Sequence, residues 1–240
     1  MIVQSEINRY VNQAGIPIFA VTRADDFEHA LPGWQPRDLM PRARSMIVFG
    51  RPFIEHPRSV DEKTHIADES WWVENVEVFE QIGEWRSTIV NILDNFGIGA
   101  ANYGGFWLTT EPTFSYRLVM ERAGIGVYGR FGVCIYPEYG CYFRVGMLLT
   151  DAELTQTPVS DLADFAPCEG CRLCADVCPV RAIDITKSPA EGYNRALCMR
   201  FILKIKERHK KESGIDPYGV KVCNRCFGVC PYARTESIER

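Results

Sequence analysis

Two cysteine motifs near the end of this 240-residue chain constrain its fold more than any other feature. The first, "CEGCRLCADVCPV", runs from Cys168 to Val180 with the spacing C-x2-C-x2-C-x3-C-P. The second, "CNRCFGVCPY", runs from Cys223 to Tyr232 and has three cysteines. A C-x2-C-x2-C run wraps three thiolates around one iron–sulfur cluster, and the cysteine before the proline serves the other cluster in two-cluster ferredoxins. The motifs therefore predict two 4Fe–4S clusters.

The second motif is one ligand short, and Cys198, in "NRALCMRF" between the motifs, is the best candidate to complete it. Two ligand sets follow: Cys168, Cys171, Cys174 and Cys230 for cluster 1, and Cys178, Cys198, Cys223 and Cys226 for cluster 2. A zinc ribbon is the alternative for repeated C-x2-C pairs, but eight cysteines with two Cys-Pro endings favour cubane clusters. The other two cysteines, Cys134 and Cys141, are expected to be small packed side chains.

Length and composition leave room for more than a ferredoxin. The chain is 46% hydrophobic with a net charge of -4, which suits one sizeable core and a small second unit. A change in composition near residue 155 predicts a first domain over 1–155 and a ferredoxin-like domain over 156–240. The mild acidity argues against a nucleic-acid binder, and the basic run "KIKERHKK" at 204–211 is expected to be a solvated helix face.

The sequence also predicts where the protein resides. The N-terminus lacks a basic region followed by an apolar run, and no stretch is long and apolar enough to span a membrane. We therefore expect a cytoplasmic protein with no membrane contact. Ten cysteines in a reducing compartment point to metal or redox chemistry.

Periodicity upstream of the motifs predicts an α+β fold. We expect a helix over 4–13, strands over 16–23 and 44–53, and two strands within 131–151 joined by a turn at 137–140. A longer helix over 71–96 is expected to bury one side, made of Val73, Val76, Phe79, Ile82 and Trp85. Three glycines further on fit a backbone that closely approaches either a flat cofactor or another strand: Gly124, Gly126 and Gly129.

Three stretches, "LMPRARSMIVFGRPF", "ERAGIGVYGRFGVCIYPEYGCYFRVGMLLTD" and "PCEGCRLCADVCPVRAI", together resemble the epoxyqueuosine reductase family, which is related to the reductive dehalogenases. The resemblance runs from about Leu39 to Tyr232. It implies a base-off corrinoid (cobalamin) on a nitroreductase-like α/β core, beside two 4Fe–4S clusters. Electrons would pass from the outer cluster to the inner one and then to the cobalt, which would reduce a small organic substrate.

The resemblance also implies site residues. Tyr139, Gly140 and Tyr142 lie where a matching segment of the family packs by the corrinoid. The full set of implied cofactor contacts is Gly124, Gly126, Tyr128, Gly129, Tyr139, Gly140 and Tyr142. Glu111 is the one acid near the position of the family's proton-donating aspartate, and a surface turn is its alternative role. Tyr116 or Tyr128, with Arg130, would imitate the tyrosine and basic residue of reductive dehalogenases; packing and an ion pair are the alternatives.

The resemblance implies an external electron donor such as a ferredoxin or flavodoxin. The family's tRNA-gripping helical repeats follow its clusters, whereas this sequence stops at Arg240, so we expect no tRNA substrate. There is no GxGxxG fingerprint for direct nicotinamide binding, and flavin is a less favoured replacement for the corrinoid. Two alternatives remain open: an electron carrier without a corrinoid, and a protein that reduces cobalamin for delivery elsewhere.

Overall fold

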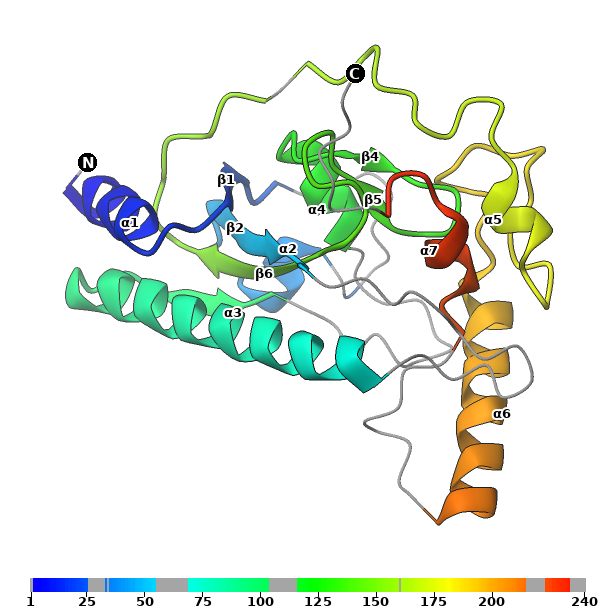
Figure 1. Cartoon of the computed structure of the whole chain (residues 1–240). Coiled ribbons are helices and arrows are strands. Elements are labelled where there is room, and N and C mark those ends of the chain that lie inside the picture. Colours follow the sequence, from blue (N-terminus) through cyan, green and yellow to red (C-terminus); the bar gives the residue numbers. More distant parts are fainter. Residues whose placement is uncertain are drawn as a thin grey trace.

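The computed structural model describes residues 2–25, 33, 35–54, 69–103, 116–159, 161–214 and 223–233. Its helices are α1 (Ile2–Gln13), α2 (Pro36–Leu39), α3 (Glu69–Asn95), α4 (Tyr116–Arg122), α5 (Leu173–Asp176), α6 (Arg195–Ser213) and α7 (Arg225–Val229). Its strands are β1 (Ile18–Arg23), β2 (Ser45–Pro52), β3 (Ala100–Asn102), β4 (Val127–Tyr128), β5 (Cys134–Ile135) and β6 (Phe143–Thr150). Figure 1 shows their arrangement.

Four strands form one antiparallel sheet in the order β1-β2-β6-β3. β2 and β6 pair along their whole lengths, from Ser45 opposite Thr150 to Pro52 opposite Phe143. The first six residues of β2 are buried, because this central strand is covered on both faces. An antiparallel sheet with separate helices is the α+β arrangement that the sequence predicts.

One face of the sheet is covered by α1 and by the long α3, which runs beneath it in Figure 1. Val3, Ile7 and Val11 recur every four residues, so α1 presents one apolar stripe to this core. From α3, Ile89 and Leu93 are fully buried in the same core. Burying each such side chain contributes roughly 1.5–3 kcal/mol, so this face holds α3 firmly on the sheet.

The buried side of α3 is only partly the predicted one. Ile82 and Trp85 are buried, but Val76 and Phe79 are 36% and 57% exposed, and Val78 is buried in their place. The Phe79 ring instead lies under the guanidinium of Arg144 from β6, with 5.8 Å between the guanidinium carbon and the ring centroid. The prediction about this half of the helix was wrong because an apolar period alone does not show which side meets the sheet.

The opposite face of the sheet packs against α4 and the small β4–β5 sheet. Met46 and Val48 of β2 lie in this second core with Val119 and Met120 of α4. The turn predicted near 137–140 is present, since Tyr136 and Gly140 form a bridge. The two strands that it joins do not pair as a hairpin, because β5 pairs with β4 while β6 enters the main sheet.

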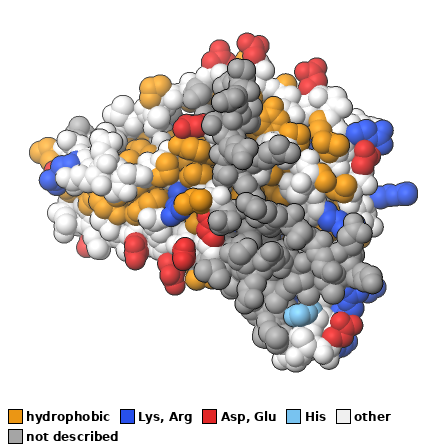
Figure 2. Space-filling model, viewed as in Figure 1, with side chains coloured by type: hydrophobic (Ala, Val, Ile, Leu, Met, Phe, Trp, Pro, Cys, Tyr) orange, Lys and Arg blue, Asp and Glu red, His pale blue; other side chains and the backbone are white. Residues whose placement is uncertain are grey.

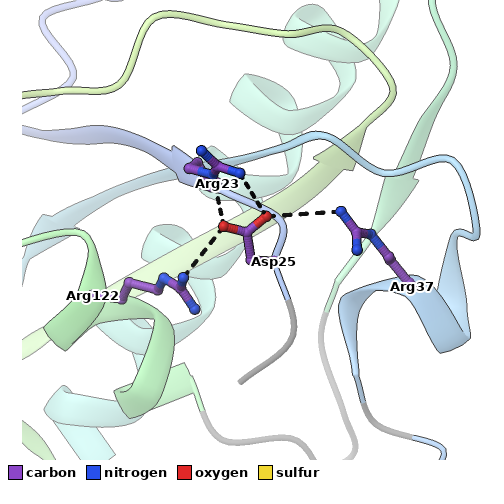
Figure 3. A network of polar contacts seen from close by, with 4 residues as sticks. All are labelled: Arg23, Asp25, Arg37 and Arg122. Atoms are coloured by element: carbon purple, nitrogen blue, oxygen red, sulfur yellow. Dashed lines mark hydrogen bonds and ion pairs between the residues drawn. The ribbon is translucent and has the colours of Figure 1, made fainter. Parts of the chain in front are cut away.

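A group of ion pairs at one edge of the sheet holds α2 and α4 near the end of β1. Figure 3 shows Asp25 between three arginines, with nitrogen–oxygen distances of 2.6 Å to Arg23, 3.5 Å to Arg122 and 3.8 Å to Arg37. All four side chains are partly exposed, so each pair contributes little on its own, up to about 1 kcal/mol.

An extended segment leads from the sheet to the cysteine-rich part. Leu154 is buried in the core beneath the sheet, and Thr157 exchanges hydrogen bonds with Val21 of β1. These contacts continue the first unit slightly past residue 155, where the division into domains stays a prediction. α6 extends away from the body at the lower right of Figure 1. In the described part of the chain, no helix combines the length and apolar character needed to cross a membrane.

Candidate metal centre

The four cysteines predicted for cluster 1 line one small cavity. Three of them lie on the loop at and before α5, and Cys230 lies at the end of α7, which packs against α5. The cavity is also lined by Arg130, Phe131, Ile135 and Tyr232. Burial raises the pKa of Cys168, and it raises the pKa of Cys174 to about 11. The fold therefore brings together thiols more than fifty positions apart, in an apolar site of the kind that a cluster occupies.

The four cysteines predicted for cluster 2 form a second group. Burial is the main reason that the pKa of Cys198 is raised, and it raises that of Cys223 to about 11. Cys178 lies close enough to both to interact with them electrostatically. Cys226, whose pKa burial also raises, is a neighbour of Cys223 and Cys198. Cys198 thus lies near the other three cysteines of the set that the sequence assigns to it.

The two groups are adjacent, because Cys226 of the second also interacts electrostatically with Cys174 of the first. Two clusters held by these groups would be neighbours, which suits the transfer of electrons between them. Within the described ranges, no three His, Cys, Asp or Glu side chains converge as they would around a single metal ion.

The two remaining cysteines differ from each other. Cys134 is buried with its sulfur against Gly126, and burial raises its pKa to about 12. Cys141 is also buried, and its interaction with the neighbouring thiol of Cys230 raises the pKa of Cys141 and lowers that of Cys230. The sequence offered no signal for this contact, because the two cysteines are 89 positions apart and Cys141 belongs to neither motif.

Gly140 fixes the turn before Cys141 against the chain that follows Cys230. Its φ is +63°, and a Cβ there would lie 1.8 Å from the carbonyl oxygen of Tyr232. We expect Gly140→Ala to lower the thermal unfolding midpoint of the anaerobic protein, because the left-handed backbone costs about 1–2 kcal/mol and Tyr232 must also move. Gly15→Ala is the matched control, since Gly15 has a φ of +60° and open space around it. Equal midpoints for the two variants would contradict the close packing at Gly140.

Arg130 binds the cluster loop. Its guanidinium donates hydrogen bonds to the carbonyl oxygens of Cys168, Ile185 and Lys187 at 3.2, 3.3 and 3.1 Å. It lies in the lining of the cluster 1 cavity, and the pairing with Tyr116 or Tyr128 that the resemblance implies stays a prediction. The positive charge beside Cys168 favours the thiolate form of that side chain, and the three hydrogen bonds hold its loop.

The two tyrosines considered as proton donors have other basic partners. Burial raises the pKa of Tyr116, while Arg144 and then Arg86 act in the opposite direction. The ring of Tyr128 lies under Arg117, with the guanidinium carbon 5.5 Å from the ring centroid. Glu111, the third predicted catalytic residue, lies outside the described residues. Each tyrosine thus has a basic neighbour, and the role of either as a proton donor stays a prediction.

Arg117 links Tyr128 to the cysteines predicted for cluster 2. It also lies over the ring of Tyr193, 5.9 Å from the centroid, and the hydroxyl of Tyr193 donates a hydrogen bond to Cys198. The Tyr193 ring packs directly on Gly132, where a Cβ would lie 2.2 Å from a ring carbon. No sequence pattern indicates this connection, because neither Arg117 nor Tyr193 belongs to a motif.

The glycines predicted to contact a corrinoid are explained by contacts within the chain. Gly124 ends α4 with a φ of +68°, its N–H bonding Glu121 while that of Ile125 bonds Met120, as in a Schellman cap. A Cβ on Gly126 would lie 2.3 Å from the carbonyl oxygen of Ile135, and one on Gly129 would lie 3.1 Å from the Ile135 side chain. The sequence left open whether these glycines lie against a flat cofactor or against another strand. In the structure, Gly126 and Gly129 lie against Ile135 of β5.

Two of the three tyrosines predicted to contact a corrinoid, Tyr139 and Tyr142, lie in different cores. Tyr142 is buried in the core beneath the sheet, where its ring lies 5.1 Å from that of Phe53. Tyr139 packs on the opposite core with its ring 5.2 Å from that of Tyr136, and burial is the main reason that its pKa is raised to about 12. The structure does not bring these side chains to one site, and their contact with a corrinoid stays a prediction.

Known proteins resemble the chain over parts of its length. Residues 164–184 match the family described as 4Fe-4S binding domain. The epoxyqueuosine reductase of Listeria monocytogenes is 33% identical over 122 residues, which cover 48% of this chain and 29% of that protein. The tetrachloroethene reductive dehalogenase of Sulfurospirillum multivorans is 31% identical over 114 residues, which cover 47% of this chain and 22% of that protein. The chain thus spans less than a third of the length of these relatives.

Solved structures share the fold. An epoxyqueuosine reductase from Bacillus subtilis superposes on 99% of this chain and 67% of its own with a TM-score of 0.63, at 18% identity. A catabolic reductive dehalogenase superposes on 98% of this chain and 32% of its own with a TM-score of 0.65, at 15% identity. Other neighbours are an epoxyqueuosine reductase with a tRNA stem loop and a dehalogenase described as B12-dependent. The chain is therefore similar in sequence to epoxyqueuosine reductases and reductive dehalogenases, and it shares their fold.

Proposed function

We propose that this chain is an iron–sulfur reductase in which two 4Fe–4S clusters pass electrons to a base-off corrinoid that reduces a small organic substrate. One observation carries the proposal: two groups of four cysteines, drawn from separate segments, lie side by side and meet at Cys174 and Cys226. A chain of this design resembles the reductases named above.

The chain's own residues have defined tasks in this proposal. Eight thiolates hold the clusters, which supply one-electron transfer when bound. Arg130 fastens the loop of cluster 1, and the hydroxyl of Tyr193 donates to Cys198 of cluster 2. Tyr116 is the preferred proton donor, since its hydroxyl is protonated at neutral pH and has Arg144 beside it to stabilise the anion that remains.

Support for the corrinoid comes from relatives. A neighbour with this fold is described as B12-dependent, and the nitroreductase-like core belongs to the same resemblance. When bound, a corrinoid supplies a strongly reducing metal centre for the organic substrate. The described glycines do not add to this support, because they approach protein atoms. That observation favours the second candidate function, an electron carrier without a corrinoid.

Cobalamin binding separates these candidates. The protein, purified without oxygen and shown to carry its clusters, is mixed with cobalamin and freed of unbound cofactor by desalting. We expect about one cobalt per chain, together with cobalt reduction when dithionite reduces the clusters. Full iron content with no retained cobalt would reject the corrinoid and favour the carrier. Retained cobalt that supports no turnover of organic substrates would favour a protein that reduces cobalamin for delivery.

The expectation that tRNA is not a substrate has no support from the comparisons. An epoxyqueuosine reductase with the same fold carries an epoxyqueuosine-modified tRNA stem loop. A modified nucleoside within tRNA therefore stands beside a free small molecule as a substrate class to test. A mobility-shift assay with such a stem loop distinguishes the two.

An external electron donor is part of the proposal, and α6 presents a surface suited to an acidic one. The helix holds Cys198 in its first turn and carries seven Lys or Arg residues against two Glu, within a chain of net charge -4. Arg200, Lys204, Arg208 and Lys211 are exposed at spacings of four and three, hence on one side of the helix. Figure 2 shows Lys and Arg side chains at the lower right, around the end of α6.

We expect electron transfer from a reduced acidic flavodoxin to slow as ionic strength rises, because salt screens the attraction to α6. Lys204→Glu should slow transfer several-fold at low salt and flatten this salt dependence. Arg42→Glu is the control, because it makes the same change of charge on the loop before β2. Stopped-flow bleaching of the clusters measures both rates, and equal slowing by the two variants would exclude α6 as the docking surface.

A further inference from the structure

Arg130 is the one charged side chain that the described residues place in the lining of the cluster 1 cavity. The rest of the lining consists of four cysteines, two prolines, Tyr232 and three apolar side chains, Phe131, Ile135 and Leu173. Apolar surroundings screen a charge far less than water does. A guanidinium in this lining therefore acts more strongly on whatever the four cysteines hold than an arginine on the open surface would.

Neutral groups hold this guanidinium in place. Its Nε donates a hydrogen bond to the carbonyl oxygen of Cys168 at 3.2 Å, and its Nη1 donates to those of Ile185 and Lys187 at 3.3 and 3.1 Å. Carbonyl groups are dipoles without net charge, and Arg130 forms no ion pair with an Asp or Glu in the described part of the chain. These partners therefore orient the positive charge of Arg130 without neutralising it.

The backbone fixes where this charge lies. Arg130 belongs to the turn between β4 and β5, which is closed by two hydrogen bonds. The N–H of Gly129 donates to the carbonyl oxygen of Val133 at 2.7 Å, and the N–H of Gly132 donates to that of Gly129 at 2.9 Å. From this turn the side chain reaches the first cysteine of the first motif and the segment that follows the motif. The guanidinium thus has a defined position beside the first predicted ligand of cluster 1.

We propose that Arg130 raises the reduction potential of cluster 1 by placing this positive charge beside it. The inference rests on the proposed clusters. A cluster becomes more negative when it accepts an electron, so a nearby positive charge stabilises its reduced form more than its oxidised form. Net charge is among the determinants of cluster potential. Arg130 acts from the cavity wall and through the loop of Cys168, which makes it a positioning residue and not a ligand.

Arg172 offers a matched comparison in the same loop. It lies between Cys171 and Leu173, but its guanidinium pairs with Asp176 at 2.9 Å and its side chain is 66% exposed. Solvent and salt screen an exposed, paired charge. Removing one unit of charge at Arg172 should therefore change the potential of cluster 1 much less than removing it at Arg130.

The test compares Arg130→Gln, Arg130→Lys and the matched control Arg172→Gln with the wild-type chain, all purified without oxygen. Iron is counted first, and both potentials are then measured by potentiometry with electron paramagnetic resonance. We expect Arg130→Gln to keep its iron and to weaken reduction of one cluster about tenfold, a downward shift of about 59 mV for one electron. Arg130→Lys should keep the wild-type potential, because lysine retains the charge without the planar fork of donors. Arg172→Gln should leave both potentials close to those of the wild type.

Other results would overturn the proposal. Unchanged potentials in iron-replete Arg130→Gln would mean that the charge does not tune the cluster. An equal shift in Arg130→Lys would assign the effect to the hydrogen bonds, and an equal shift in Arg172→Gln would assign it to any charge on the loop.

If Arg130→Gln loses about four irons, Arg130→Lys decides the matter. Iron kept at the wild-type potential in Arg130→Lys would show that cluster 1 needs the charge, whereas iron lost there too would make Arg130 a structural anchor and overturn the proposal. Failure of the proposed function is seen separately, as wild-type protein that lacks the two clusters before any potential is measured.

Discussion

Replacing Cys171 with alanine is expected to remove cluster 1 and to leave about four iron atoms per chain, because a cubane with three thiolates in this exposed loop loses iron readily. Cys171 lines the cavity with Cys168, Cys174 and Cys230, and Cys141 is a further thiol close to Cys230. Iron is measured per chain on protein purified without oxygen. Cys134→Ala is the control and should keep the full iron content.

Two other outcomes of the Cys171→Ala experiment would contradict this expectation. Full iron content in Cys171→Ala would show that Cys171 is not a ligand and that the cavity holds something else. Complete loss of iron would show that the second cluster cannot form without the first, so that the two groups do not behave as separate sites.

Replacing Cys198 with alanine is expected to remove cluster 2 and leave cluster 1. Cys198 lies in the first turn of α6, where Asn194 caps the helix by accepting the N–H of Leu197 at 2.9 Å. The neighbouring hydroxyl of Tyr193 favours the thiolate form of Cys198, against the burial that raises its pKa overall. Iron should again fall to about four atoms per chain.

A double variant distinguishes the two sites. Cys171→Ala with Cys198→Ala should lose all iron, because the two cysteines serve different clusters. Cys171→Ala with Cys174→Ala should still keep about four irons, because both changes fall on cluster 1. If the first double variant kept four irons, Cys171 and Cys198 would share a cluster and the ligand sets would be wrong.

The sequence predicted which cysteines lie near one another, because the spacing typical of cluster ligands is local and can be recognised without the fold. Their role as cluster ligands stays a prediction. The role of Cys198 was harder to predict, because a single cysteine between two motifs is singled out only by the ligand that the second motif lacks. Its position beside Cys178 and Cys223 could be expected from counting alone.

Contacts between distant segments could not be predicted in the same way. Cys141 lies near Cys230 because its backbone N–H bonds the carbonyl oxygen of Tyr232. Tyr116 lies near Arg144 because α4 and β6 share one core. No period or spacing encodes such pairs. The glycines are a further example. A glycine at position 126 indicates that another atom comes close to the backbone, but the sequence does not show that this atom belongs to Ile135.

The predictions of helices and strands show the same contrast between local patterns and contacts made by distant segments. The strand around 44–53 and the helix around 71–96 were predicted from their apolar runs and both are present. Phe79 was placed in the core and is exposed, because the sheet meets the neighbouring stripe of α3 that contains Val78 and Ile82. Periodicity predicts that a helix is amphipathic more reliably than it predicts how the helix is rotated on its sheet.

The most direct test of the central claim is the content of iron, acid-labile sulfide and zinc per chain in protein purified without oxygen. Two 4Fe–4S clusters predict about eight irons and eight sulfides, with no zinc, and a broad visible absorption that dithionite bleaches. One or two zinc ions per chain, with no sulfide, would contradict the account and make the cysteine groups structural zinc sites.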